Sequence, residues 1–203
     1  MASALLAGFL LGFTIAASPG PIALLCVRRT LARGWPEGFA SGLGAATADG
    51  FYGGIAAFGM SAAAHLLLSE RRWLALAGGL VLIALGVRGL VDRTEPDSGG
   101  ESTPGSLARA YGSVVGLTLA NPQTIIGFAA AFGTAGILVR LVPAGLTLGV
   151  LAGSAAWWAL LAGGVALARR RLGTGPVRLL RAASGGLLAA LGAAAVVAAV
   201  LAR

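Results

Sequence analysis

Two proline motifs, each well inside an apolar run, are the positions of this 203-residue chain best suited to binding chemistry. Proline removes a backbone donor and clashes with the preceding turn, so a helix should break at each motif. Ser and Asn are favoured N-caps, and proline is favoured as the first helical residue. Both motifs therefore predict a break followed by a new helix, starting at Ser18-Pro19 and at Asn121-Pro122. The motif residues are Ser18, Pro19, Gly20, Pro21, Asn121, Pro122 and Gln123.

Each new helix start would expose unpaired N–H groups and the positive end of a helix dipole inside the membrane. Two such ends brought together form a natural site for an anionic group such as a carboxylate. The structural alternative is a pair of proline kinks, which are common in membrane helices. Because the two motifs occupy equivalent positions in two halves of the chain, we favour substrate binding.

Asp49 is the acidic residue that lies well inside an apolar segment. A carboxylate in hydrocarbon is costly, so its side chain should face the bundle interior or a wet cavity. It could carry a proton, bind the ammonium of a substrate or hydrogen-bond a neighbouring helix, and the sequence leaves the first two open. Trp157 and Trp158 lie near the middle of a later apolar segment, where cavity lining and core packing are both open interpretations.

The elements that must position these residues are membrane helices. The chain is 57% hydrophobic and 11% charged, with a mean hydropathy of +0.88, whereas soluble domains are about 45–50% apolar and about 25% charged. Each apolar segment is near the length of about 20 residues that a helix needs to cross the hydrocarbon core. The six segments are 4–27, 38–60, 73–91, 108–133, 142–167 and 178–201.

The two halves of the chain resemble each other. Residues 33–42 and 140–149 share the pattern R-x-x-P-x-G-x-x-x-G, and residues 78–80 and 185–187 share Gly-Gly-Leu at the same offset. Each half holds three segments, an odd number, so the second half should insert upside down, as in alternating-access transporters. We therefore predict an all-α membrane protein of six transmembrane helices, as two inverted three-helix repeats with broken first and fourth helices. The repeats are 1–91 and 108–203, joined by a polar linker at 92–107.

The arginines predict the orientation of the chain. All fifteen basic residues are Arg, and eleven of them flank the connections between segments one and two, three and four, and five and six. Cytoplasmic loops carry the excess of positive charge, which places these three connections in the cytoplasm and both termini outside. The eleven are Arg28, Arg29, Arg33, Arg88, Arg93, Arg109, Arg169, Arg170, Arg171, Arg178 and Arg181.

Glycines at a spacing of four predict close helix packing. One ladder, Gly34, Gly38 and Gly42, enters the second segment, and another lies in the fifth at Gly145, Gly149 and Gly153. Such small-residue ladders let helix backbones approach closely in membranes.

Taken together, these motifs resemble those of the LysE/RhtB family of amino-acid exporters. The resemblance rests on Pro19-Gly20-Pro21, on the glycine-spaced stretch that ends at Asp49, and on Asn121-Pro122-Gln123. It covers nearly the whole chain and implies proton-driven export of amino acids or related metabolites across a bacterial plasma membrane. Family members often have Gly before the acid and Lys after Asn-Pro, where this chain has Ala48 and Gln123. The missing cation weakens any transfer of substrate specificity.

Other functions find less support in the sequence. A divalent metal-ion exporter of the cadmium type, the main alternative, needs several intramembrane acids, His or Cys, and the spans offer Asp49 and Cys26. A single cysteine leaves no pair for thiol electron transfer, and no nucleophile lies beside a base as in a hydrolase. We expect no enzyme, no cofactor, no metal site and no nucleic-acid partner. The expected partners are a small-molecule substrate and the bilayer, with a homo-oligomer left open.

Overall fold

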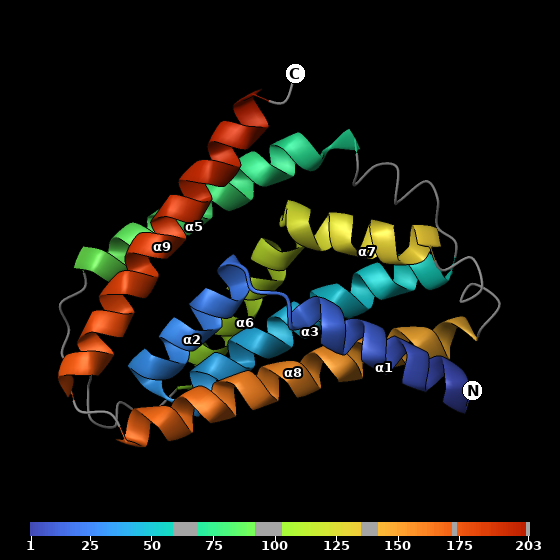
Figure 1. Cartoon of the computed structure of the whole chain (residues 1–203), viewed down its shortest axis with the longest axis horizontal. Coiled ribbons are helices and arrows are strands. Elements are labelled where there is room, and N and C mark those ends of the chain that lie inside the picture. Colours follow the sequence, from blue (N-terminus) through green and yellow to red (C-terminus); the bar gives the residue numbers. More distant parts are fainter. Residues whose placement is uncertain (59–68, 92–102, 135–141, 172–173, 202–203) are drawn as a thin grey trace.

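The computed structural model describes residues 1–58, 69–91, 103–134, 142–171 and 174–201. Within these residues every regular element is an α-helix (Figure 1). The helices are α1 Ala2–Ala16, α2 Pro21–Arg33, α3 Trp35–Ala57, α5 Arg71–Val91, α6 Pro104–Leu119, α7 Pro122–Thr134, α8 Pro143–Arg171 and α9 Thr174–Leu201.

The first apolar segment forms two helices, α1 and α2, which are bent by 78° at the break between them. The break is confirmed, but the expected helix start at Ser18-Pro19 is wrong, because α2 begins at Pro21 with Gly20 as its N-cap. A residue before proline is disfavoured in the helical region, and Gly20 is extended, with φ −165° and ψ −177°. The second proline therefore sets the start of α2.

The fourth apolar segment also forms two helices, α6 and α7, and here the expected cap is confirmed. The side-chain Oδ1 of Asn121 accepts a hydrogen bond of 3.1 Å from the backbone N–H of Gln123, and Pro122 is the first residue of α7. The break frees the carbonyl of Leu119, which accepts a hydrogen bond of 2.6 Å from the hydroxyl of Tyr52 on α3.

The start of α6 differs from the linker boundary expected from the sequence. The helix begins at Pro104, so residues 104–107 are helical. Thr103 is the N-cap, and its hydroxyl oxygen accepts a hydrogen bond of 3.2 Å from the backbone N–H of Ser106. The rest of the expected linker, residues 92–102, lies outside the described residues.

Two described helices are long and apolar enough to cross a membrane by themselves: α8, and residues Ala182–Leu201 of α9. The bent pair α1 and α2 also meets this criterion when taken as one broken span. The six-span arrangement in inverted repeats thus remains a prediction for the chain as a whole.

The helices pack in two groups that α2 connects. In the first group α1 packs on α8, α8 on α3, and α3 on α6, whereas α5 and α9 pair with each other (Figure 1). Helix α2 lies between the groups and contacts α3, α8 and α9. Its buried Leu25 and Cys26 belong to a core that includes Val114 of α6 and Leu188 of α9.

The glycines of α8 make the close helix contact that the sequence predicts. A Cβ on Gly149 would overlap the backbone oxygen of Leu5, and a Cβ on Gly153 would overlap that of Phe9, both on α1. The glycines of α3 form no single seam, because a Cβ on Gly38 would meet α2 at Thr30 and a Cβ on Gly42 would meet α8 at Trp158.

Candidate functional site

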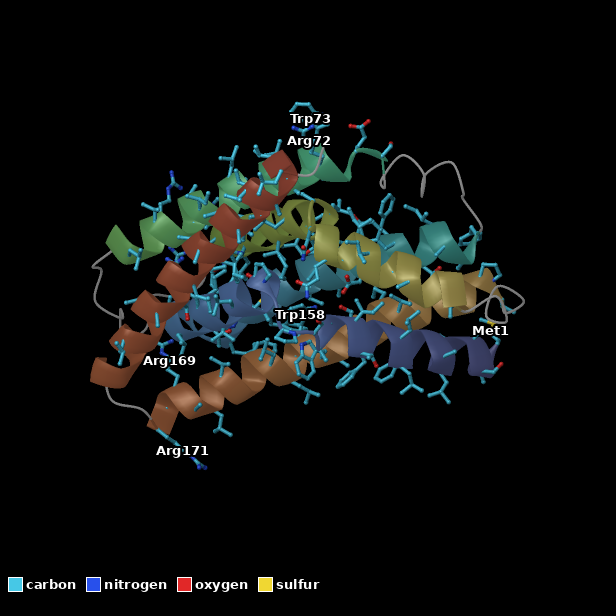
Figure 2. The ribbon with its side chains drawn as sticks, turned by 45° about the horizontal axis from the view of Figure 1, so that its top comes forward. Met1, Arg72, Trp73, Trp158, Arg169 and Arg171 are labelled. Atoms are coloured by element: carbon cyan, nitrogen blue, oxygen red, sulfur yellow. The ribbon has the colours of Figure 1, made fainter. Side chains whose placement is uncertain are left out.

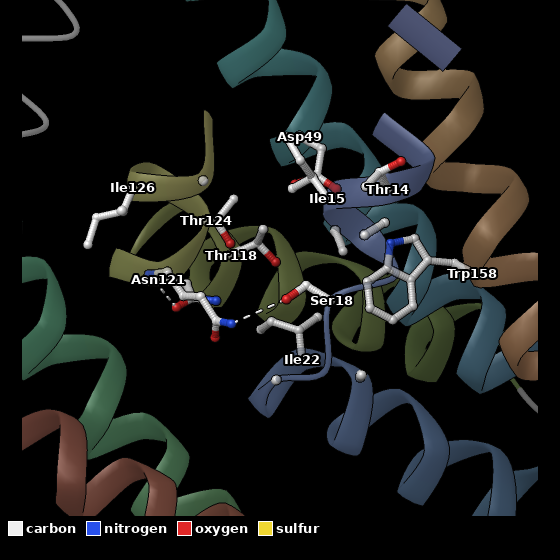
Figure 3. Close-up of a pocket in the computed structure, with 16 residues that line it drawn as sticks. Thr14, Ile15, Ser18, Ile22, Asp49, Thr118, Asn121, Thr124, Ile126 and Trp158 are labelled. Carbon is white, nitrogen blue, oxygen red and sulfur yellow. Dashed lines mark hydrogen bonds between the residues drawn. The ribbon is translucent and has the colours of Figure 1, made fainter. Parts of the chain in front are cut away.

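A cavity of about 400 Å³ lies where the two helix breaks meet (Figure 3). Its wall combines residues of α1, α2, α3, α6, α7 and α8 with residues of both breaks. The lining residues are Thr14, Ile15, Ala16, Ser18, Gly20, Ile22, Ala23, Ala45, Asp49, Thr118, Asn121, Gln123, Thr124, Ile126, Gly127 and Trp158.

The two breaks contact each other directly through Gln123. Its side-chain Nε2 donates a hydrogen bond of 3.4 Å to the hydroxyl of Ser18 (Figure 3). A Cβ on Gly20 would lie 3.1 Å from the Oε1 of Gln123, so the amide lies closely against the first break. Residues 105 apart in sequence thereby form one wall.

The structure brings most of the expected site residues together. Ser18, Gly20, Asn121 and Gln123 line the cavity, and so does Asp49. The prolines have other places: Pro19 is exposed, Pro21 lines a neighbouring cavity and Pro122 begins α7. The prolines create the breaks, and the residues beside them form the wall.

Asp49 is 3% exposed and is linked to α8 by two hydrogen bonds in series. The hydroxyl of Ser154 donates to the carboxylate Oδ2 of Asp49 over 2.6 Å, and the indole Nε1 of Trp158 donates to the same hydroxyl over 3.1 Å. The indole donor therefore leaves the Ser154 proton directed at the carboxylate. Trp158 also lines the cavity, whereas Trp157 packs edge-on against Phe13, with ring centroids 5.4 Å apart.

Thr118 offers an unused polar group to the cavity. The residue is 2% exposed, and its hydroxyl has no hydrogen-bond partner among the described residues. A buried hydroxyl without a partner is costly. A polar atom of a bound molecule would satisfy it.

Charge in the wall is confined to one carboxylate. Asp49 is the ionisable residue among those that line the cavity. The complementary positive potential comes from the N-terminal end of α2, whose first-turn residues Ile22 and Ala23 line the cavity, because a helix N-terminus presents a positive dipole end. The first N–H groups of α7 are already bonded, since that of Gln123 donates to the Oδ1 of Asn121 and those of Thr124 and Ile125 donate to the Asn121 carbonyl. The site thus pairs one negative side chain with the positive backbone end of α2, and the free N–H groups expected at the start of α7 are instead bonded to Asn121.

Several site residues were not found from the sequence. Ser154 and Thr118 carry common hydroxyl groups with no local motif, although Ser154 follows Asp49 by 105 residues, close to the offset of the internal repeat. Glu37, which does not line the cavity, is a further buried acid, 1% exposed, and its Oε1 lies 3.4 Å from the Nη1 of Arg33. It lies one residue before the expected second segment, so hydropathy did not mark it as buried.

Metal-binding side chains do not cluster in the described part of the chain, where no three His, Cys, Asp or Glu residues come together. Cys26 of α2 is buried in the hydrophobic core between the helices and does not line the cavity.

A model of the LysE type translocator family matches residues 13–199. The chain belongs to this family. The family is one of membrane transporters, so this translocator is a multi-pass membrane protein whose fold class agrees with the helical structure. Neither the curated proteins nor the solved structures contain a match to it.

Proposed function

We propose that this translocator exports amino acids or closely related small metabolites from the cytoplasm across the plasma membrane. The observation that supports this best is the cavity that joins both helix breaks and contains the buried carboxylate of Asp49. Its volume of about 400 Å³ falls within the usual range of small-molecule sites, about 300–1,000 Å³.

The polar groups of the cavity complement an amino acid. The carboxylate of Asp49 would bind the substrate ammonium, and the N-terminal end of α2 would bind the substrate carboxylate. The unpaired hydroxyl of Thr118 would complete the contact with one of these groups. The amides of Asn121 and Gln123, also in the wall, supply further neutral hydrogen bonds.

We infer six membrane spans in two inverted repeats, residues 1–91 and 108–203. In this scheme α1 with α2, and α6 with α7, are the equivalent broken spans. The pairing of α3 with α8 and of α5 with α9 supports it, because a pseudo-twofold axis brings equivalent helices together. Transport by alternating access follows from such an architecture.

We propose that the arginine-rich end of the bundle faces the cytoplasm. Figure 2 shows Arg169 and Arg171 at the end of the molecule opposite Met1. The Nη1 of Arg169 lies 3.8 Å from where a Cβ on Gly34 would be, so the arginine-bearing ends of α2 and α8 are adjacent. By the positive-inside rule, we propose that the N-terminus lies outside, with the C-terminus on the same side in a six-span chain.

Asp49 is the proposed coupling residue. Its carboxylate holds either a proton or the substrate ammonium, and competition between the two would link export to the proton gradient. Ser154, which donates to the same carboxylate, would hold the group in place in the state without substrate.

An efflux assay tests this function. Cells or proteoliposomes that contain the translocator should release labelled amino acids, and expressing cells should survive toxic amino-acid analogues. Asp49→Asn should abolish both effects, because it removes the carboxylate without changing the size of the side chain. Glu70→Gln, which removes one charge at an exposed position, is the matched control and should keep activity.

Two results would contradict the proposal. Full activity of the Asp49→Asn variant would remove Asp49 from the mechanism. Protection against cadmium or nickel in cells that export no amino acid would favour metal-ion export.

A further inference from the structure

A second cavity of about 190 Å³ adjoins the first one. It lies between the α5–α9 pair and the two helix breaks, with lining residues from α2, α5, α6, α7 and α9 and from the break between α6 and α7. Three residues line both cavities: Ile22, Asn121 and Gln123. These three side chains therefore form the partition between the two spaces.

The two cavities differ in chemistry. Apart from the shared residues, the second wall consists of apolar side chains and glycines, with Ala75, Leu82, Leu117 and Leu191 among them. Apolar cavities of this kind hold water poorly and bind apolar groups, and one of about 150 Å³ accommodates benzene. The space of about 190 Å³ is thus large enough for an apolar group of similar size.

We propose that the second cavity binds the apolar side chain of the substrate, which passes between Ile22 and Gln123 while the ammonium and carboxylate stay in the first cavity. The inference rests on the proposed function and narrows its substrate class. The preferred cargo is an amino acid with an apolar side chain of branched-aliphatic to phenyl size. Charged side chains are disfavoured, because this wall would leave them without partners.

The position of the polar groups favours a substrate over a lipid tail. The amides of Asn121 and Gln123 lie where the two cavities meet. A molecule with a polar head and a short apolar tail satisfies both the amides and the apolar wall. A lipid acyl chain would bring no polar group to that partition.

The test fills the second cavity from a residue that lies outside the first. Ala75 is buried on α5 and lines the second cavity alone, so Ala75→Phe should occupy the proposed subsite. Ala77→Phe adds the same ring at an exposed position two residues away and is the matched control. The measurement is counterflow of labelled leucine and alanine by the full-length protein in proteoliposomes.

We expect Ala75→Phe to raise the KM for leucine about tenfold or more, since small changes in an apolar pocket alter discrimination by about 10–200-fold. The KM for alanine should change less than about twofold, and Ala77→Phe should change neither value. Leu82→Ala, which enlarges the same cavity, should improve transport of phenylalanine relative to leucine.

Other outcomes would overturn the inference in distinguishable ways. If the wild-type protein moves no amino acid, the proposed function fails and the subsite fails with it. If it moves leucine and alanine and Ala75→Phe affects both equally or neither, only the subsite is refuted. If Ala75→Phe displaces a co-purified lipid and leaves the leucine-to-alanine ratio unchanged, the second cavity is a lipid site.

Discussion

The carboxylate of Asp49 has two interactions, one with the cavity and one with neighbouring side chains. Its carboxylate faces the cavity and also accepts a hydrogen bond from the hydroxyl of Ser154. The oxygen of that hydroxyl in turn accepts a hydrogen bond from the indole N–H of Trp158. The three side chains connect α3 to α8. A change in what Asp49 binds would therefore alter the hydrogen bonds that connect α3 to α8.

The hydrogen bond from Ser154 should matter for transport only through Asp49. Ser154→Ala should lower the transport rate about tenfold or more, since a hydrogen bond to a charged group contributes about 1.5–3 kcal/mol. Adding it to Asp49→Glu, which keeps a carboxylate but moves it relative to the Ser154 hydroxyl, should cause little further loss, because the two residues form one unit. Thr147→Val, on the same helix, removes a hydroxyl that donates to the backbone carbonyl of Pro143 and is the control.

Initial efflux rates from proteoliposomes for the two single variants and the double variant measure this coupling. Independent, multiplicative losses would show that Ser154 acts elsewhere.

The unpaired hydroxyl of Thr118 predicts opposite effects on stability and on substrate binding. Thr118→Val keeps the shape of the side chain and removes a buried hydroxyl that has no partner among the described residues. The free energy of unfolding should therefore stay equal or rise by up to about 1–3 kcal/mol. The KM for substrate should increase, because the substrate loses its partner. Melting curves in detergent and counterflow kinetics test the two halves separately, and unchanged kinetics would place the hydroxyl outside the binding site.

At the scale of elements, the pairing of α1 with α8 depends on backbone contact. Gly8 and Gly12 of α1 approach the backbone of Leu146 and Val150 on α8, and Gly149 and Gly153 make the reciprocal approach to α1. This pairing holds the first half of one broken helix against the helix that carries Ser154 and Trp158. The seam thus positions one side of the cavity.

A methyl group in this seam should separate the two helices. We expect Gly153→Ala to destabilise the protein by about 1–3 kcal/mol, as overpacking of a well-packed contact does, since the new Cβ would overlap the carbonyl of Phe9. Gly164→Ala on the same helix has open space around the new Cβ and should be neutral or slightly stabilising. The melting temperatures of both variants in detergent provide the comparison, and equal values would mean that the seam tolerates a wider spacing.

Across the whole molecule, the described arginines of α8 lie at one end of that helix. Arg169 and Arg171 end α8 at the end opposite Met1 (Figure 2). Arg29 of α2 donates from Nη1 to the hydroxyl of Ser41 over 2.8 Å and from Nη2 to that of Ser113 over 2.9 Å. Helices α2, α3 and α6 are thereby joined by an arginine that belongs to the group expected on the cytoplasmic side.

Side-specific labelling tests the orientation. The only cysteine, Cys26, is buried and can be replaced by Cys26→Ser to give a background without thiols. In that background Glu70→Cys should react with a membrane-impermeant maleimide in intact cells, whereas Arg171→Cys should react only after permeabilisation. Both positions are exposed, so accessibility within the protein does not limit either reaction, and the reverse pattern would invert the proposed topology.

The sequence by itself determined the helical class and the two breaks, because apolar length and proline chemistry act locally. The cap at Asn121 followed from the same local rules. The start of α2 was predicted wrongly at Ser18-Pro19, although its cause is local, because Pro21 keeps Gly20 out of the helix. Asp49 stood out because a carboxylate in an apolar run is costly wherever the helix packs.

Only the tertiary structure decided which residues contact the two breaks and Asp49. The breaks contact each other through Gln123 and Ser18, Asp49 bonds to Ser154, and the hydroxyl of Thr118 has no partner in the part of the chain that the structure describes. The first two pairs join residues about a hundred positions apart, and their geometry depends on how the helices cross. Such contacts arise from packing between helices, whereas a break or a cap is set by the few residues that form it.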